Sequence, residues 1–133
     1  MMSTIQYTSD VGVVTDQEFF SVVIPPVSSK RELLEGYNLM LKFPYFGFNW
    51  DALWDLLCDF HWITQRHIHI YHESVASIPV EDLKVFLEII VRVCEDWKIP
   101  RPALPLWRMK THHFYFNSNE EEHIKSIIQS LSI

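Results

Sequence analysis

The sequence predicts an α/β fold, in which a small three-stranded parallel sheet is packed with helices and extended at both ends. Three short runs rich in β-branched and aromatic residues, at 19–24, 67–71 and 113–117, have the composition of strands. Longer segments between and after them repeat apolar residues at helical spacing. Strands that alternate with helices favour a parallel sheet with right-handed crossover connections.

The first strand and helix follow a polar lead-in. Residues 1–18 are weakly patterned, which leaves open a short extra strand or a mobile segment. Residues 19–24 (FFSVVI) are closed by two prolines and suit a buried strand. Ser29 and Glu32 form a capping box for a helix that ends before Pro44.

The later elements are separated by a proline-rich connection. Residues 67–71 (HIHIY) alternate as a strand does, and the long apolar stripe of residues 80–97 predicts a helix. Prolines make residues 98–112 irregular over most of their length. After the third strand, Ser118 with Glu121 forms another capping box, which predicts a C-terminal helix.

Residues 43–57 (FPYFGFNWDALWDLL) carry the strongest functional signal in the chain. An aromatic loop punctuated by Pro and Gly runs straight into a helix, which we expect to continue to about Trp62. Asn49 suits the N-cap position, because its side-chain oxygen can accept from a free backbone N–H of the first turn. Apolar residues at helical spacing predict the buried face, which includes Ala52, Leu53, Leu56, Leu57 and Phe60.

A second face of this helix is acidic. Asp51, Asp55 and Asp59 recur at i, i+4 and i+8, and like charges at this spacing oppose the helix by roughly 0.2–0.5 kcal/mol per pair. A solvated acidic face is the ordinary interpretation of such a row. Here the same segment is crowded with rings, which favours an exposed surface that a basic partner covers. These rings belong to Tyr45, Phe46, Phe48, Trp50 and Trp54.

This segment resembles the signature of the barstar family, small proteins that inhibit the secreted ribonuclease barnase. The family pattern, aromatic-aromatic-Gly-x-Asn-x-Asp-Ala-Leu-Trp-Asp, stands here as residues 45–55 (YFGFNWDALWD). The close match covers about fifteen residues, 43–57, and the order of elements extends it loosely from about Phe19 to Asn117. The resemblance implies a three-stranded parallel sheet. The N-terminal extension, the proline-rich connection and the C-terminal helix depart from the family.

The resemblance also implies roles for the signature residues. In barstar-like proteins the signature loop and helix enter the nuclease cleft, where a helix carboxylate replaces a substrate phosphate. Carried over, Asp55 is the phosphate mimic, and Asp51 pairs with a second cationic group. Tyr45 lies on the rim, Trp54 packs beneath the acidic row, and Phe60 stands where the family has an aromatic residue. The expected partner-binding site is Tyr45, Asn49, Asp51, Trp54, Asp55, Asp59 and Phe60.

Composition narrows the kinds of partner and compartment. The formal charge of −6 argues against direct nucleic-acid binding, since phosphate contacts depend on Lys and Arg, and it fits a basic protein partner. The apolar content predicts one folded domain over residues 1–133, with its core at about 19–117. No stretch suits a membrane span or a secretory signal, so we expect a cytoplasmic protein, monomeric when free, with Cys58 and Cys94 reduced.

No motif in the chain indicates catalysis. There is no Gly-rich phosphate loop, CxxC pair or HExxH. His67, His69 and His72 could in principle bind a metal, but packed or hydrogen-bonded strand histidines are the stronger interpretation. Asp51 and Asp55 could form a glycosidase-like pair, but no other catalytic residues surround them. We therefore expect no enzymatic activity, no cofactor and no metal.

These observations favour an intracellular, immunity-type inhibitor that occludes the active site of a basic toxin, a ribonuclease or other nuclease. Glu88 is the nearest candidate for an acidic residue that the family uses on its later helix. Two alternatives stay open. One is a barstar-like interaction domain with a regulatory partner. The other is a small-molecule or sugar-binding domain that uses Trp50 and Trp54, which requires a deep pocket at the signature helix.

Overall fold

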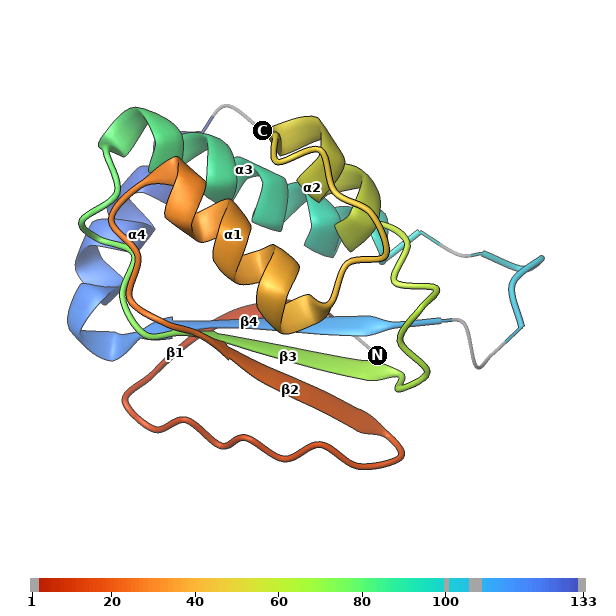
Figure 1. Cartoon of the computed structure of the whole chain (residues 1–133). Coiled ribbons are helices and arrows are strands. Elements are labelled where there is room, and N and C mark those ends of the chain that lie inside the picture. The colour runs from red at the N-terminus through yellow and green to blue at the C-terminus, as the bar shows by residue number, and fades with distance from the viewer. Residues whose placement is uncertain (1–2, 100, 106–108, 132–133) are drawn as a thin grey trace.

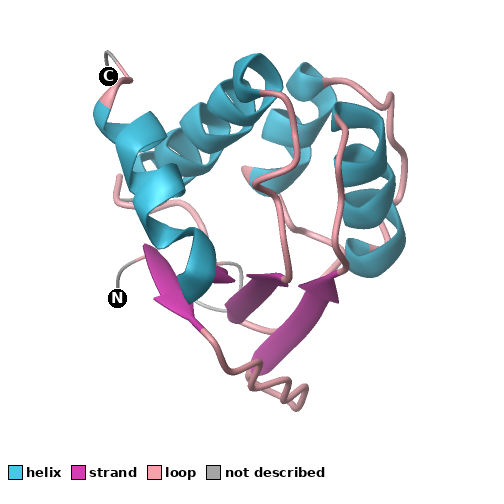
Figure 2. Ribbon diagram, turned by 90° about the vertical axis from the view of Figure 1, so that its left-hand side faces the viewer, coloured by secondary structure: helices cyan, strands magenta, loops and turns pink. Residues whose placement is uncertain are grey.

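The computed structural model describes residues 3–99, 101–105 and 109–131. Its strands are β1 (Thr4–Thr8), β2 (Phe19–Ile24), β3 (His67–His72) and β4 (Thr111–Asn117). Its helices are α1 (Lys30–Leu41), α2 (Trp50–Leu57), α3 (Val80–Asp96) and α4 (Glu121–Gln129), with a short 3-10 turn, η2 (Ser118–Glu120), before α4. All strand pairs are parallel, in the order β1-β4-β3-β2. The helices cover one face of the sheet (Figures 1 and 2).

The predicted α/β class and parallel sheet are confirmed, but the prediction of three strands is wrong, because the sheet has four. The additional strand, β1, comes from the N-terminal extension and pairs with β4 at one edge. Its sequence, TIQYT, is mostly polar, and none of its residues is fully buried. Only Ile5 and Tyr7 pack against the core, so β1 is held by its pairing with β4 and by these two partly buried side chains.

The connection from β1 to β2 crosses the face of the sheet that the helices leave open (Figure 1). It also contacts the outer edge of β2. Thr15 Oγ1 donates to the Ser21 carbonyl oxygen at 3.3 Å and accepts from the Ser21 N–H at 3.2 Å. The Asp16 N–H donates to the Phe19 carbonyl oxygen at 2.9 Å. These bonds use backbone groups of β2 that face away from β3.

The helix ends use capping groups that the sequence predicts only in part. Ser29 caps α1 as predicted, since its side chain accepts from the Glu32 N–H at 3.1 Å, but the Glu32 carboxylate accepts from the Ser28 N–H, at 2.8 Å, in place of the Ser29 N–H of a capping box. The capping box predicted for α4 is wrong, because Ser118 lies in η2 and the N-cap, Glu120, makes no side-chain cap bond. Glu120 instead accepts from the Val75 N–H at 2.9 Å, which ties η2 to the loop before α3.

The core lies between the helices and the sheet, where aromatic and aliphatic side chains are fully buried. Alternation along β3 sends Ile68 and Ile70 toward the helices. Gly36 allows α1 to approach β2 closely, because a Cβ there would lie 3.3 Å from Ile24 Cγ2. The residue that weakens α1 by propensity therefore serves its packing.

Two histidines are buried in this core. His72 Nδ1 donates to the Tyr115 carbonyl oxygen at 2.8 Å, so its Nε2 accepts from the Tyr37 hydroxyl at 2.6 Å. The ring of His112 lies 5.1 Å from that of Trp97, and within the described chain neither of its nitrogens has a hydrogen-bond partner. Burial lowers the pKa of His72 to about 4 and that of His112 to about 3, so both rings are neutral at pH 7.

The other strand histidines lie on the opposite face of the sheet. His67 Nδ1 is 2.8 Å from the Thr111 hydroxyl, and the rings of His69 and His113 stack with centroids 4.6 Å apart. Because His72 faces the helices, it does not converge with His67 and His69. Among the residues that the structure describes, no group of three or more His, Cys, Asp or Glu is placed to hold a metal ion.

We expect the free energy of unfolding to fall as the pH is lowered from about 6.5 toward 4. The unfolded chain binds protons at His72 and His112 near their ordinary pKa, whereas the folded chain keeps both rings neutral, so stability is lost with decreasing pH. Each histidine should cost about 1.4 kcal/mol per pH unit in this window. Urea denaturation at pH 7 and pH 5 measures the change.

His112→Leu is the control for this prediction. It removes two buried nitrogens that have no partner in the described chain, so at pH 7 the variant should be at least as stable as the wild type. Its stability should also depend less steeply on pH. An unchanged pH slope would mean that His112 does not contribute to the acid sensitivity.

Candidate functional site

The signature loop fixes the direction in which α2 starts. Asn49 is the N-cap, as predicted, and its Oδ1 accepts from the Ala52 N–H at 2.8 Å. Gly47 leaves room for this amide, because a Cβ there would lie 3.0 Å from Asn49 Nδ2. Phe48 adopts a left-handed backbone conformation with φ 52°, which strains a bulky residue.

α2 ends at Leu57, so the prediction that this helix continues to about Trp62 is wrong. The indole Nε1–H of Trp97, just after α3, donates to the Leu57 carbonyl oxygen at 3.2 Å and caps the helix from outside. Phe60 then takes a left-handed conformation with φ 52° and turns the chain. The apolar spacing continues past Leu57, which is why local pattern does not mark this end.

The early end of α2 changes the place of two expected site residues. Phe60 is fully buried, with its ring 5.3 Å from that of Trp62 and 4.8 Å from that of His112. It is therefore a core residue that supports the turn and offers no surface to a partner. Asp59 lies in the turn after α2, where its carboxylate contacts His61 Nδ1. Asp59 thus does not extend the acidic face of the helix.

The other two acidic residues of α2 are exposed, as the helical spacing predicts. Asp51 and Asp55 are exposed one turn apart on α2. Neither carboxylate forms an ion pair or hydrogen bond with the described residues. Tyr45 is 65 % exposed. The leucines of α2 are fully buried, whereas Ala52 is only partly covered. We call Asp51 and Asp55 the acidic pair.

Trp54 lies between the acidic pair and α3. It is half-buried and packs against the core. With Trp50 and Asp51 it lines an open hollow of about 320 Å³, whose other wall includes Glu88 and Arg92 of α3. Glu88 and Arg92 form an ion pair at 3.1 Å. The structure thus brings Glu88 beside Asp51 and adds Arg92, which nothing in the signature segment indicates.

The two cysteines are free thiols. Burial, reinforced by the Asp96 carboxylate, raises the pKa of the Cys58 thiol to about 12. Burial also raises the pKa of Cys94 to about 12. A thiol with such a pKa is protonated at neutral pH and is a poor nucleophile. These cysteines therefore serve packing. Cys94 is buried, as expected, whereas Cys58 is only partly buried and lies just after the end of α2.

The fold is thus that of a small α/β protein in which a parallel sheet supports a capped helix with exposed carboxylates and nearby aromatic rings. A profile of the family described as barstar (barnase inhibitor) matches residues 17–117. The chain belongs to this family. Comparison with curated proteins and with solved structures found no match.

β1 and α4 lie outside the matched range and contact each other. Lys125 Nζ of α4 is 5.3 Å from the ring centroid of Tyr7 of β1. Figure 1 shows α4 and α2 at opposite ends of the helical layer. The two additions therefore extend the fold away from the signature helix. None of the helices described is both long and apolar enough to cross a bilayer.

We expect Asn49→Ala to lower the free energy of unfolding by about 1 kcal/mol, because the first turn of α2 loses its cap. Asn49→Asp loses the long bond from Asn49 Nδ2 to the Gly47 carbonyl oxygen, at 3.3 Å, but it keeps the acceptor oxygen and places a negative charge at the positive end of the helix dipole. It should therefore be more stable than Asn49→Ala. Urea denaturation of the three proteins measures both effects. Equal stability of Asn49→Ala and the wild type would mean that other contacts hold the start of α2.

Proposed function

We propose that this protein is an intracellular, immunity-type inhibitor that covers the active site of a basic toxin, a ribonuclease or another nuclease. Family membership supports an inhibitor, since the family is described by its inhibition of barnase. One observation carries the proposal to this chain. Asp51 and Asp55 are exposed on a helix held at both ends, and no cation of the described chain pairs with them.

The chemistry of a nuclease cleft explains why such carboxylates would bind it. Nucleases hold phosphate groups with Arg and Lys, and a carboxylate offers the same cations two acceptor oxygens in one plane. In the proposal Asp55 takes the place of a phosphate, and Asp51 pairs with a second cation. Glu88 shares a hollow with Asp51, so it can contribute a third negative charge once Arg92 turns away.

The remaining site residues have supporting roles in the proposed complex. Tyr45 covers the rim, and Asn49 holds the start of α2. Trp54, which is half-buried, packs beneath the acidic pair and holds the orientation of the helix that carries it. Asp59, which contacts His61, lies at the margin of the proposed binding surface. Phe60 acts only from the core, by fixing the turn after the helix.

The proposal extends to the free protein. We infer a single cytoplasmic domain over residues 1–133 that is monomeric, has no catalytic activity and needs no cofactor. Its formal charge of −6 would speed encounter with a basic toxin. The hollow beside Trp50 and Trp54 is open to solvent, so it does not favour the alternative of a ligand-binding domain, which would enclose its ligand.

Capture from the native cell tests the identity of the partner. Tagged wild-type protein should retain a basic nuclease that Asp55→Ala retains poorly. The purified nuclease should lose activity when the wild-type protein is added in equal amount. A captured partner without toxin or nuclease activity would favour the regulatory interaction domain instead.

We expect Asp55→Ala to weaken the complex with the captured nuclease by about 2–5 kcal/mol, as for truncation of one side of a buried charged pair. Most of the loss should appear in the off-rate. Folding stability should change little, because this carboxylate is exposed and removal of an i,i+4 repulsion is favourable. Surface plasmon resonance and thermal melts measure the two effects.

Glu122→Ala is the matched control for Asp55→Ala. Glu122 is an exposed residue of α4, at the other end of the helical layer from α2 (Figure 1). This variant removes the same charge, so it should alter mainly the on-rate and its salt dependence. An unchanged off-rate for Asp55→Ala would place the binding surface elsewhere on the protein.

A further inference from the structure

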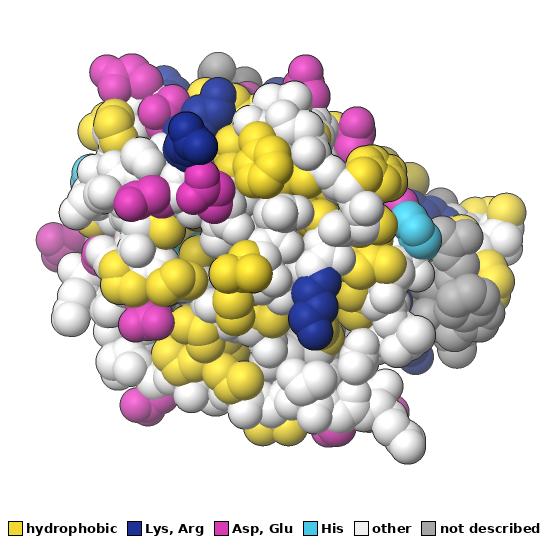
Figure 3. Space-filling model, viewed as in Figure 1, with side chains coloured by type: hydrophobic (Ala, Val, Ile, Leu, Met, Phe, Trp, Pro, Cys, Tyr) yellow, Lys and Arg dark blue, Asp and Glu magenta, His cyan; other side chains and the backbone are white. Residues whose placement is uncertain are grey.

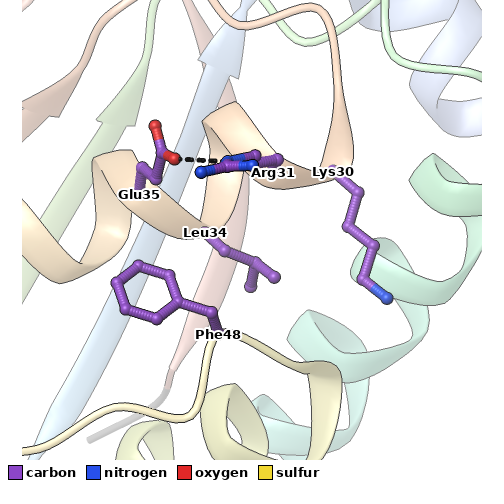
Figure 4. Close-up of a pocket in the computed structure, with 5 residues that line it drawn as sticks. All are labelled: Lys30, Arg31, Leu34, Glu35 and Phe48. Carbon is purple, nitrogen blue, oxygen red and sulfur yellow. Dashed lines mark hydrogen bonds and ion pairs between the residues drawn. The ribbon is translucent and has the colours of Figure 1, made fainter.

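A second hollow lies between the signature loop and α1 (Figure 4). Its volume is about 680 Å³, and its lining residues are Lys30, Arg31, Leu34, Glu35 and Phe48. None of them belongs to the expected partner-binding site. Figure 3 shows basic and apolar side chains next to one another on this face of the molecule. We call this feature the α1 hollow.

The apolar wall of the α1 hollow is Phe48. Its side chain is 50 % exposed, and its backbone is left-handed. A bulky residue keeps such a conformation only where the surrounding structure or the function requires it. One side of the ring is held by Phe46, with centroids 4.9 Å apart, and the rest of it is open to solvent. Phe48 also stands at a variable position of the family pattern, before Asn49. Leu34, which is 2 % exposed, lies beside it in Figure 4.

The charge around the α1 hollow is unbalanced. Arg31 and Glu35 pair at 2.8 Å and offset each other (dashed line in Figure 4). Lys30 Nζ lies 5.1 Å from the ring centroid of Trp50, and no carboxylate of the described chain forms an ion pair with it. The rim therefore carries a positive charge beside an apolar wall, although the whole chain has a formal charge of −6.

The α1 hollow adjoins the hollow beside the acidic pair, because Lys30 of the first contacts Trp50 of the second. One side of this ring meets Lys30, and the residue also lines the hollow that contains Asp51. A partner that covers Asp51 and Asp55 would therefore extend over Phe48 and Lys30. A basic side chain of that partner would be repelled at Lys30, while a ring would pack on Phe48 and a carboxylate would pair with the ammonium group.

We propose that the α1 hollow is a second subsite of the binding surface, which receives an aromatic side chain of the partner together with an adjacent carboxylate. The subsite rests on the proposed inhibitor function and refines it. Active-site cations are common to many nucleases, so the acidic pair alone discriminates poorly between them. A subsite that accepts an acidic, aromatic patch and rejects a basic one supplies specificity by attraction and by repulsion.

Phenylacetate is the probe for this subsite, because it joins a phenyl ring to a carboxylate. Benzylamine, which joins the same ring to a cation, is the control. In NMR spectra of the free, full-length protein, phenylacetate should shift signals of Lys30, Leu34 and Phe48 with about millimolar affinity, as a fragment-sized ligand does. Benzylamine should bind about tenfold more weakly, because Lys30 repels its charge.

Two surface variants separate the contributions of ring and charge. Phe48→Asn removes the ring and keeps a residue that tolerates the left-handed backbone, so it should abolish the phenylacetate shifts. Lys30→Gln should bring the affinities of phenylacetate and benzylamine together. Equal binding of both probes to the wild type, shifts confined to other residues, or shifts that survive Phe48→Asn would overturn the subsite.

Asp55→Ala distinguishes failure of the subsite from failure of the proposed function. This change lies outside the α1 hollow, so the variant should bind phenylacetate as the wild type does. Phenylacetate binding without inhibition of any captured nuclease would overturn the inhibitor function while supporting the subsite. Inhibition without phenylacetate binding would overturn the subsite alone.

Discussion

The acidic face of α2 depends on two hydrogen bonds that hold the ends of this helix. An eight-residue helix is not stable by itself in water. Asn49 satisfies its first turn, and the Trp97 indole, brought in by α3, satisfies the carbonyl of Leu57. Buried leucines supply the packing between these ends. A carboxylate on so constrained a backbone loses less conformational entropy on binding than one on a loop.

The sequence predicts those parts of the fold whose signal is local. The run of residues 19–24 matches β2, because it is apolar throughout and closed by prolines. The pattern of β1 does not set it apart as a strand, because only Ile5 and Tyr7 alternate toward the core and its place in the sheet is fixed by pairing with β4 at the other end of the chain. The end of α2 was missed for the same reason, because Trp97, which caps it, lies 40 residues beyond Leu57.

In the candidate site, too, local sequence pattern predicts some residues correctly and misses those whose position depends on distant contacts. Helical periodicity is enough to predict that Asp51 and Asp55 are exposed while the leucines of α2 are buried. Periodicity does not reveal that Phe60 turns inward, because that follows from a left-handed residue packed on the core. Nor does it bring Lys30 to Trp50, since this contact joins two helices across the signature loop. Tertiary neighbours of this kind carry the specificity of a surface.

The hydrogen bonds between the polar lead-in and β2 affect how readily the protein aggregates at high concentration. β2 is an edge strand of uncharged, strongly β-forming residues, a sequence of the kind that templates cross-β assembly. The Thr15 hydroxyl bonds to both outward backbone groups of Ser21, and Asp16 bonds to both of those of Phe19. The lead-in thus covers backbone groups of this edge that would otherwise be open to pairing with a strand of another molecule, so proteolytic cleavage before β2 should raise the tendency of the protein to aggregate.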